Sequence, residues 1–146
     1  MHPTHPPADL DPTPADILRG AITYLRLHGW HQGALYRRND RTRAFPPACQ
    51  IAAIHTAGCG TADVDSRCLA DKGQWNLIHR ATTAVALHLM EQAGYYRPEL
   101  DVTLTELDSY EYASDWNDDA ARTVADVIVA LTAAATAWDR THGGAQ

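Results

Sequence analysis

Cys49 is the residue of this sequence best placed to act as a nucleophile. It lies at the start of an apolar segment that we expect to be helical, and the positive potential at a helix N-terminus lowers the pKa of a thiol. His79 or His88 would act as its base, and Gln32 would donate a hydrogen bond to an oxyanion. No active-site signature surrounds Cys49, and the competing interpretation is a buried cysteine that only packs.

Thiol and imidazole groups also suggest a metal site. The candidate ligands are Cys49, His55, Cys59 and Cys68. Tetrahedral zinc accepts this donor set, and His55 and Cys59 are one helical turn apart. However, the sequence has no C-x-x-C pair, and we expect Gly58 to end the helix before Cys59. We therefore expect no cofactor, with zinc as the alternative.

Acidic residues are concentrated in one part of the sequence. Between Arg97 and Arg122 there is no lysine or arginine, and the carboxylates there are Glu99, Asp101, Glu106, Asp108, Glu111, Asp115, Asp118 and Asp119. Such a surface could dock on a basic partner, with aromatic residues of the same segment as anchors, or mimic nucleic-acid phosphates. The alternative is a solvated segment whose aromatic side chains fold inward. The candidate partner-binding residues are Glu106, Asp108, Tyr110, Glu111, Tyr112 and Trp116.

A second charged cluster has the opposite sign. Its members are Arg37, Arg38, Arg41 and Arg43, of which the first three are further candidate partner-binding residues. Guanidinium groups bind phosphates, but only Tyr36 and Phe45 are nearby for base stacking, so a solvated loop or an internal partner for the acidic segment is favoured. The net charge of −6 also argues against a general affinity for nucleic acid. We expect a protein partner.

Apolar residues recur at intervals of three and four, which predicts amphipathic helices. The predicted helices cover residues 14–28, 47–57, 74–93 and, as a short element, 104–112, followed by a last helix whose apolar face runs from residue 124 to 138. Thr13 and Asp16 form a T-x-x-D capping signature for the first helix, and Gly29 ends it. Asn117 is the predicted N-cap of the last helix.

These elements predict a mainly α fold, a compact bundle of about four helices. The segment from residue 34 to 45, between the first two helices, is expected to form a short β-hairpin or an irregular loop. We predict one helical domain over residues 13–140, a disordered proline- and histidine-rich tail over residues 1–12, and a frayed tail over residues 141–146.

The sequence carries no secretory signal, and its three cysteines are an odd number, so reduced thiols in the cytoplasm are expected. The weakly polar stretch from residue 127 to 138 is too short to span a membrane, and no membrane association is expected.

Several short motifs of the sequence resemble those of a known protein family. They are Gly29-Trp30 at the end of the first helix, Gln32-Gly33-Ala34, Cys49 opening an alanine-containing helix, Trp116-Asn117-Asp118, and Arg122-Thr123 followed by Asp126-Val127. Over residues 14–138 the chain resembles small uncharacterised proteins of actinobacteria and their phages. The resemblance implies no established activity and no site residues, and the prolines that lead into Cys49 depart from its pattern.

Two functions remain open at this point. The leading hypothesis is a macromolecular-interaction module, accessory or regulatory, of a bacterium or phage. The alternative is a small enzyme, cysteine-dependent or zinc-assisted, centred on Cys49. The sequence leaves the partner, the oligomeric state and the biological process undetermined.

Overall fold

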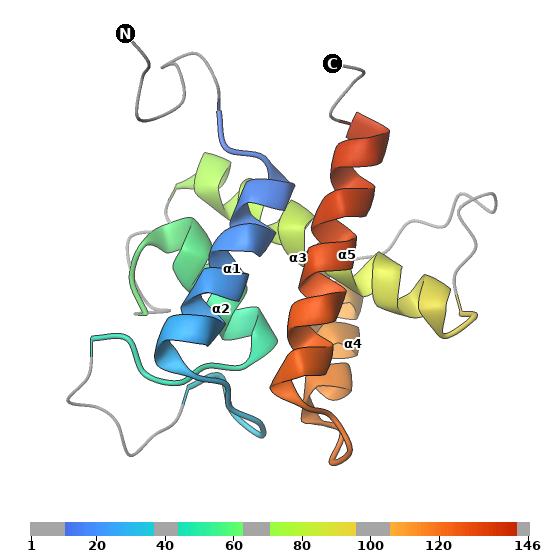
Figure 1. Cartoon of the computed structure of the whole chain (residues 1–146). Helices are drawn as coiled ribbons and strands as arrows, with labels where there is room; N and C mark the ends of the chain where they lie inside the picture. The colour runs from blue at the N-terminus through green and yellow to red at the C-terminus, as the bar shows by residue number, and fades with distance from the viewer. Residues whose placement is uncertain (1–10, 37–43, 63–70, 96–105, 143–146) are drawn as a thin grey trace, which may run out of the picture.

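A computed structural model describes residues 11–36, 44–62, 71–95 and 106–142 of the chain. They form five helices, one more than the four or so expected from the sequence (Figure 1). The helices are α1 (Pro14–His28), α2 (Gln50–Cys59), α3 (Lys72–Gln92), α4 (Glu106–Asp118) and α5 (Val124–His142). The mainly helical prediction is thus confirmed for the described residues.

No hairpin is seen between α1 and α2 in the described residues. Two isolated bridges, Trp30 with Ala48 and Tyr36 with Ala48, instead hold the segment after α1 against the segment before α2. Residues 37–43, the middle of the segment expected to form the hairpin, lie outside the described residues. Residues 1–10 and 143–146 of the two predicted tails also lie outside them.

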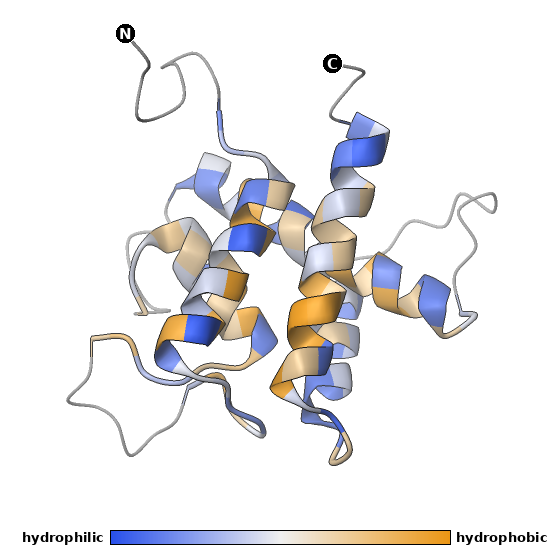
Figure 2. Ribbon diagram, viewed as in Figure 1, coloured by the Kyte–Doolittle hydropathy of each residue, from blue (hydrophilic) through white to orange (hydrophobic). Residues whose placement is uncertain are grey.

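The helices surround one apolar core. In Figure 1, α1 and α5 lie side by side, α2 and α3 pack on α1, and α4 lies behind the lower half of α5. The largest fully buried apolar side chains come from four of the helices and are Leu18, Ile51, Ile54, Ile78, Val85, Val127 and Leu131. Figure 2 shows the most apolar stretch of α5 in its N-terminal half. Burial of these side chains is the main driving force for the fold.

The first helix forms as its sequence predicts. The Asp16 amide donates to Thr13 Oγ1 at 3.2 Å and the Thr13 amide donates to Asp16 Oδ2 at 2.9 Å, so the capping box is confirmed. Gly29, at φ 98°, follows the last residue of α1, and its amide donates to the Leu25 carbonyl.

The bounds of α2 differ from the prediction. Cys49 is the N-cap rather than a residue of the first turn, because its Sγ accepts a hydrogen bond from the Ala52 amide at 3.4 Å. The helix also continues through Gly58 to Cys59 and ends at Gly60, whose φ of 78° is left-handed. The expectation that Gly58 ends the helix was wrong. Gly58 is needed there because any larger residue would place its Cβ against the Ile78 side chain of α3.

The start of α5 also differs from the prediction. Asn117 lies in the last turn of α4, so it is not the N-cap of α5. Thr123 fills that position, since its Oγ1 accepts from the Asp126 amide at 3.2 Å and its own amide donates to Asp126 Oδ2 at 2.9 Å. The T-x-x-D pair of Thr123 and Asp126, next to the apolar residues of α5, therefore marks the start of this helix. Asn117 has a different role, which is described below.

We expect Gly58→Ala to destabilise the protein by about 1–3 kcal/mol, although alanine favours a helix over glycine. A Cβ on Gly58 would lie 2.3 Å from Ile78 Cγ1 and 2.7 Å from Ile78 Cδ1. Urea denaturation measures the change. In an Ile78→Ala background, which removes both contact atoms, the same substitution should cost clearly less. An equal cost in both backgrounds would show that the α2–α3 contact does not require glycine.

Candidate functional site

The Asn117 side chain is the centre of a buried polar cluster. Its Oδ1 accepts hydrogen bonds from Trp30 Nε1 at 2.7 Å and from the Gln50 amide at 3.0 Å. Its Nδ2 donates to the His31 carbonyl at 3.3 Å and to Asp118 Oδ1 at 3.0 Å. An asparagine amide offers two acceptor and two donor positions, and all four are used here in a residue with no exposed surface.

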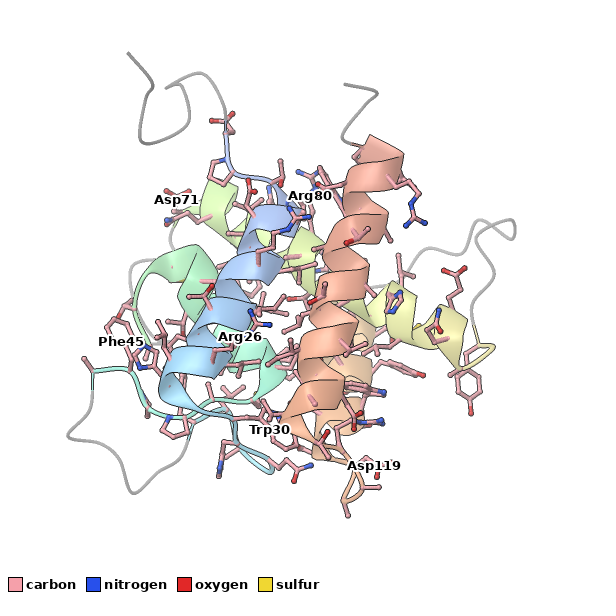
Figure 3. All side chains as sticks on the ribbon, viewed as in Figure 1. Arg26, Trp30, Phe45, Asp71, Arg80 and Asp119 are labelled. Carbon is pink, nitrogen blue, oxygen red and sulfur yellow. The ribbon has the colours of Figure 1, made fainter. Side chains whose placement is uncertain are left out.

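The loop after α1 is fixed to the end of α4 by further hydrogen bonds. Gln32 Nε2 donates to the Asn117 carbonyl at 2.9 Å and to the Asp119 carbonyl at 2.8 Å. The Gly33 amide donates to Asp118 Oδ1 at 2.9 Å. Figure 3 shows Trp30 and Asp119 at the same end of the molecule. Gln32 Nε2 thus binds two backbone carbonyls, one in α4 and one in the following turn, and its role as an oxyanion donor stays a prediction.

The turn between α4 and α5 is closed by Arg122. Its guanidinium carbon lies 3.8 Å from the centroid of the Trp116 ring, and its Nε donates to the Trp116 carbonyl at 3.0 Å. Its Nη2 lies 4.0 Å from Asp119 Oδ2, a weak contact because the Asp119 carboxylate is more than half exposed. Stacking on the indole and the Nε hydrogen bond together fix the plane of the guanidinium.

We expect Asn117→Ala to cost about 3 kcal/mol or more of folding free energy. The substitution leaves the buried Gln50 amide and partly buried polar groups of Trp30 and His31 without their partner. Urea denaturation monitored by tryptophan fluorescence measures the loss. Asp115→Ala, at an exposed position on the same helix, is the matched control and should change stability by less than about 0.5 kcal/mol. Similar losses in both variants would contradict the central role of Asn117.

Cys49 lies beside this cluster and lines a cavity of about 230 Å³. Tyr110, Ser114 and Asp118 of α4 line the same cavity. Burial raises the pKa of the Cys49 thiol to about 11, hydrogen bonds from backbone amides of α2 oppose this, and the Asp118 charge adds to it. At neutral pH Cys49 is therefore a protonated thiol that caps α2, because desolvation outweighs the favourable potential of the helix N-terminus.

The structure does not bring the predicted bases to this cavity. Of the described residues that line it, none is a histidine. His79 is half-buried on α3, and His88, further along α3, lines a different cavity. Burial lowers the pKa of His88, so its ring is neutral at pH 7. The catalytic role of Cys49, His79, His88 and Gln32 stays an untested prediction, without the geometry it requires.

We expect the titration of Cys49 to reduce stability at alkaline pH. Its thiol has a pKa of about 11 in the folded state against 9.0 in a free chain, so the folded state binds more protons between these values. The stabilising contribution is present below about pH 9 and is lost as the pH rises through about 11. Urea denaturation of the wild type and of Cys49→Ala across this range measures it. Other groups titrate in both proteins, so only the difference in slope reports Cys49, and parallel curves would contradict the raised pKa.

The proposed metal ligands do not form a cluster in the described residues. Cys59 is disulfide-bonded, so its sulfur is not available as a thiolate ligand and the expectation of reduced thiols was wrong for this residue. His55 packs edge-on against Trp75 with ring centroids 5.8 Å apart. No group of three histidine, cysteine or acidic side chains suited to a metal is found among the described residues, and Cys68 lies outside them.

The acidic partner-binding candidates lie on α4. Asp108, Glu111 and Asp115 are exposed, and the side chain of Glu106 lies outside the described part of the structure. Tyr110 is partly exposed and Tyr112 is half-buried against Tyr95, with ring centroids 6.4 Å apart. Trp116 is covered by Arg122 and is thus not a free anchor. Arg37, Arg38, Arg41 and Arg43 lie outside the described residues.

Sequence reasoning missed the role of Asn117 and of Trp30. The sequence predicted Asn117 as a helix cap and left Trp30 without a polar partner. The one signal in the sequence was the Trp116-Asn117-Asp118 motif, which places a neutral amide in an otherwise acidic segment. The indole N–H of Trp30 is a donor that such an amide can accept. Nothing in local spacing could join residues 30 and 117, which are 87 positions apart.

Comparison with known proteins gives one match. A family model described as "Family of unknown function (DUF6197)" matches residues 9–137, nearly the whole chain. The chain belongs to this family. No curated protein and no solved structure matches it. The expected resemblance to an uncharacterised family is thus confirmed, whereas the actinobacterial or phage origin stays a prediction.

None of the described helices is long and apolar enough to cross a membrane. The cytoplasmic location stays a prediction.

Proposed function

We propose that this member of the DUF6197 family is a non-enzymatic interaction module that binds a basic protein surface through α4. The observation that carries the proposal is a stripe of exposed carboxylates on that helix. Asp108, Glu111, Asp115 and Asp118 are spaced three, four and three residues apart, so they share one face. The sequence of α4 contains no lysine or arginine.

This arrangement carries an energetic cost within the folded protein. Like charges three or four residues apart destabilise a helix by a few tenths of a kcal/mol per pair. The opposite face of α4 compensates, because Ser109, Ala113 and Asn117 are fully buried and the Asn117 amide fixes the end of the helix. A helix held this firmly can present repelling charges to a partner without fraying. Electrostatic complementarity with a basic surface would then speed association and select the partner.

Aromatic side chains flank the stripe. Tyr112 lies on α4 next to the carboxylates, and Tyr95, which follows α3, packs edge-on against it while 79% of its own surface is exposed. Such amphipathic rings are enriched at protein interfaces, where they supply contact area at a small entropic cost. Trp116 does not belong to this set, since Arg122 covers its ring.

The cysteine-dependent enzyme is the weaker candidate. The thiol of Cys49 caps α2, has a raised pKa, and shares its cavity with a carboxylate that disfavours the thiolate further. A nucleophile needs the opposite electrostatic environment.

The proposal is tested by selecting peptides from a random library on the immobilised protein. We expect the selected peptides to be rich in lysine and arginine and to bind less tightly as salt is raised. Glu111→Lys combined with Asp115→Lys should weaken their binding by about tenfold or more, by replacing attraction with repulsion. The matched control, Asp11→Lys with Glu91→Lys, changes the net charge equally at exposed sites outside α4 and should bind nearly as well as the wild type.

Two results would overturn the proposal. One is a set of selected peptides without basic residues. The other is equal loss of binding in the α4 pair and in the control pair, which would show that only net charge matters and that α4 is not a specific surface.

A further inference from the structure

A second cavity, of about 420 Å³, opens between the C-terminal part of α3 and the N-terminal part of α5. Its volume falls in the range of small-molecule sites, roughly 300–1,000 Å³. Leu89, Val129 and Ala130 give it an apolar lining, and Val129 has 66% of its surface exposed at the rim. Four polar residues also line it: His88 and Gln92 from α3, Arg122 from the turn before α5, and Asp126 from the first turn of α5. It is separate from the acidic face of α4, and the inference below stands independently of the proposed function.

Arg122 and Asp126 are held in place by hydrogen bonds, but each keeps a polar atom that has no hydrogen-bond partner among the described residues. Arg122 is held by the stack on Trp116 and by its Nε hydrogen bond, its side chain is only 23% exposed, and Nη1 has no hydrogen-bond partner in the described residues. Asp126 is fixed through Oδ2, which accepts from the Thr123 amide, while its Oδ1 accepts no hydrogen bond from a described residue. The Nη1 group of Arg122 and the Oδ1 atom of Asp126 are thus available to bind a ligand in the same cavity.

The opposite wall offers neutral groups. His88 and Gln92 are one helical turn apart on α3, and neither side chain has a hydrogen-bond partner in the described residues. Both can donate to or accept from a ligand. The lining is therefore mostly apolar with a few convergent polar groups, which is the composition of a typical small-ligand site.

We propose that this cavity binds a small zwitterion with an apolar body, the chemistry of a free apolar α-amino acid. Arg122 would bind the carboxylate, which a guanidinium fork recognises in a bidentate manner. Asp126 would bind the ammonium, and the apolar body would lie against Leu89, Val129 and Ala130. A ligand with only a carboxylate would be repelled by Asp126, and a ligand with only an ammonium group would be repelled by Arg122. The site therefore requires both charges.

The test is a titration of ¹⁵N-labelled protein with L-leucine and L-phenylalanine, followed by NMR. We expect a saturable shift of the Trp116 indole N–H, because Trp116 lines the cavity and stacks on Arg122. The indole signals of Trp75 and Trp138 serve as internal references, since neither residue lines the cavity. N-acetyl-L-leucine, which lacks the ammonium, and L-leucinamide, which lacks the carboxylate, should each bind about tenfold more weakly.

Variants assign the two charges. Asp126→Asn keeps an oxygen for the Thr123 amide and should abolish the preference for L-leucine over N-acetyl-L-leucine. Arg122→Gln should abolish the preference over L-leucinamide. Val129→Trp fills the cavity from an exposed position and should remove the shift altogether, whereas Thr136→Trp, exposed on the same helix, should leave it unchanged.

Three results would overturn the inference. The first is no saturable shift with either amino acid in protein whose circular dichroism spectrum is helical. The second is a shift that persists in Val129→Trp. The third is equal binding of L-leucine and N-acetyl-L-leucine to the wild type, which would mark a site for any carboxylate, including the C-terminus of a peptide.

Discussion

The relative positions of three segments of the fold depend on one fully satisfied amide, which is buried in the last turn of α4. Asn117 joins the loop after α1, the first turn of α2 and the end of α4, with two donors and two acceptors in use. Inside a protein an unpaired polar group is costly, so the loss of any one of these hydrogen bonds is unfavourable. This set of hydrogen bonds therefore specifies the relative positions of three segments more sharply than apolar contact can, since apolar packing tolerates small shifts.

The neighbouring Gln50 shows the contrast. Its side chain is equally buried, but neither its Nε2 nor its Oε1 has a hydrogen-bond partner among the residues that the structure describes. A buried amide without partners opposes folding, so the Gln50 side chain has no stabilising role that the structure shows. The Gln50 backbone, in contrast, is held by Asn117.

Burial and exposure separate the chemistry of three places on and around α4. Around Cys49, burial and the Asp118 charge keep the thiol protonated, which suits a helix cap and opposes nucleophilic catalysis. On the outer face of α4 Glu111 and Asp115 are exposed, which suits recognition of a basic surface. At the turn into α5, Arg122 stacks on Trp116 and carries a fixed positive charge to the edge of a separate cavity. The family model adds no activity to these observations, so they rest on the residues alone.

The sequence by itself determined the features that depend on near neighbours. The spacing of apolar residues predicted the helices, and the Thr13–Asp16 capping box and Gly29 placed the ends of α1 correctly, because both act within one helical turn. Only the tertiary structure decided the role of Asn117, the need for glycine at position 58, the state of Cys59 and the stack of Arg122 that borders the second cavity. Asn117 reads locally as a cap, and Gly58 reads locally as a helix end. Their true roles come from Trp30 and Ile78, which lie far away in the chain, and no local pattern records which distant side chain a residue will meet.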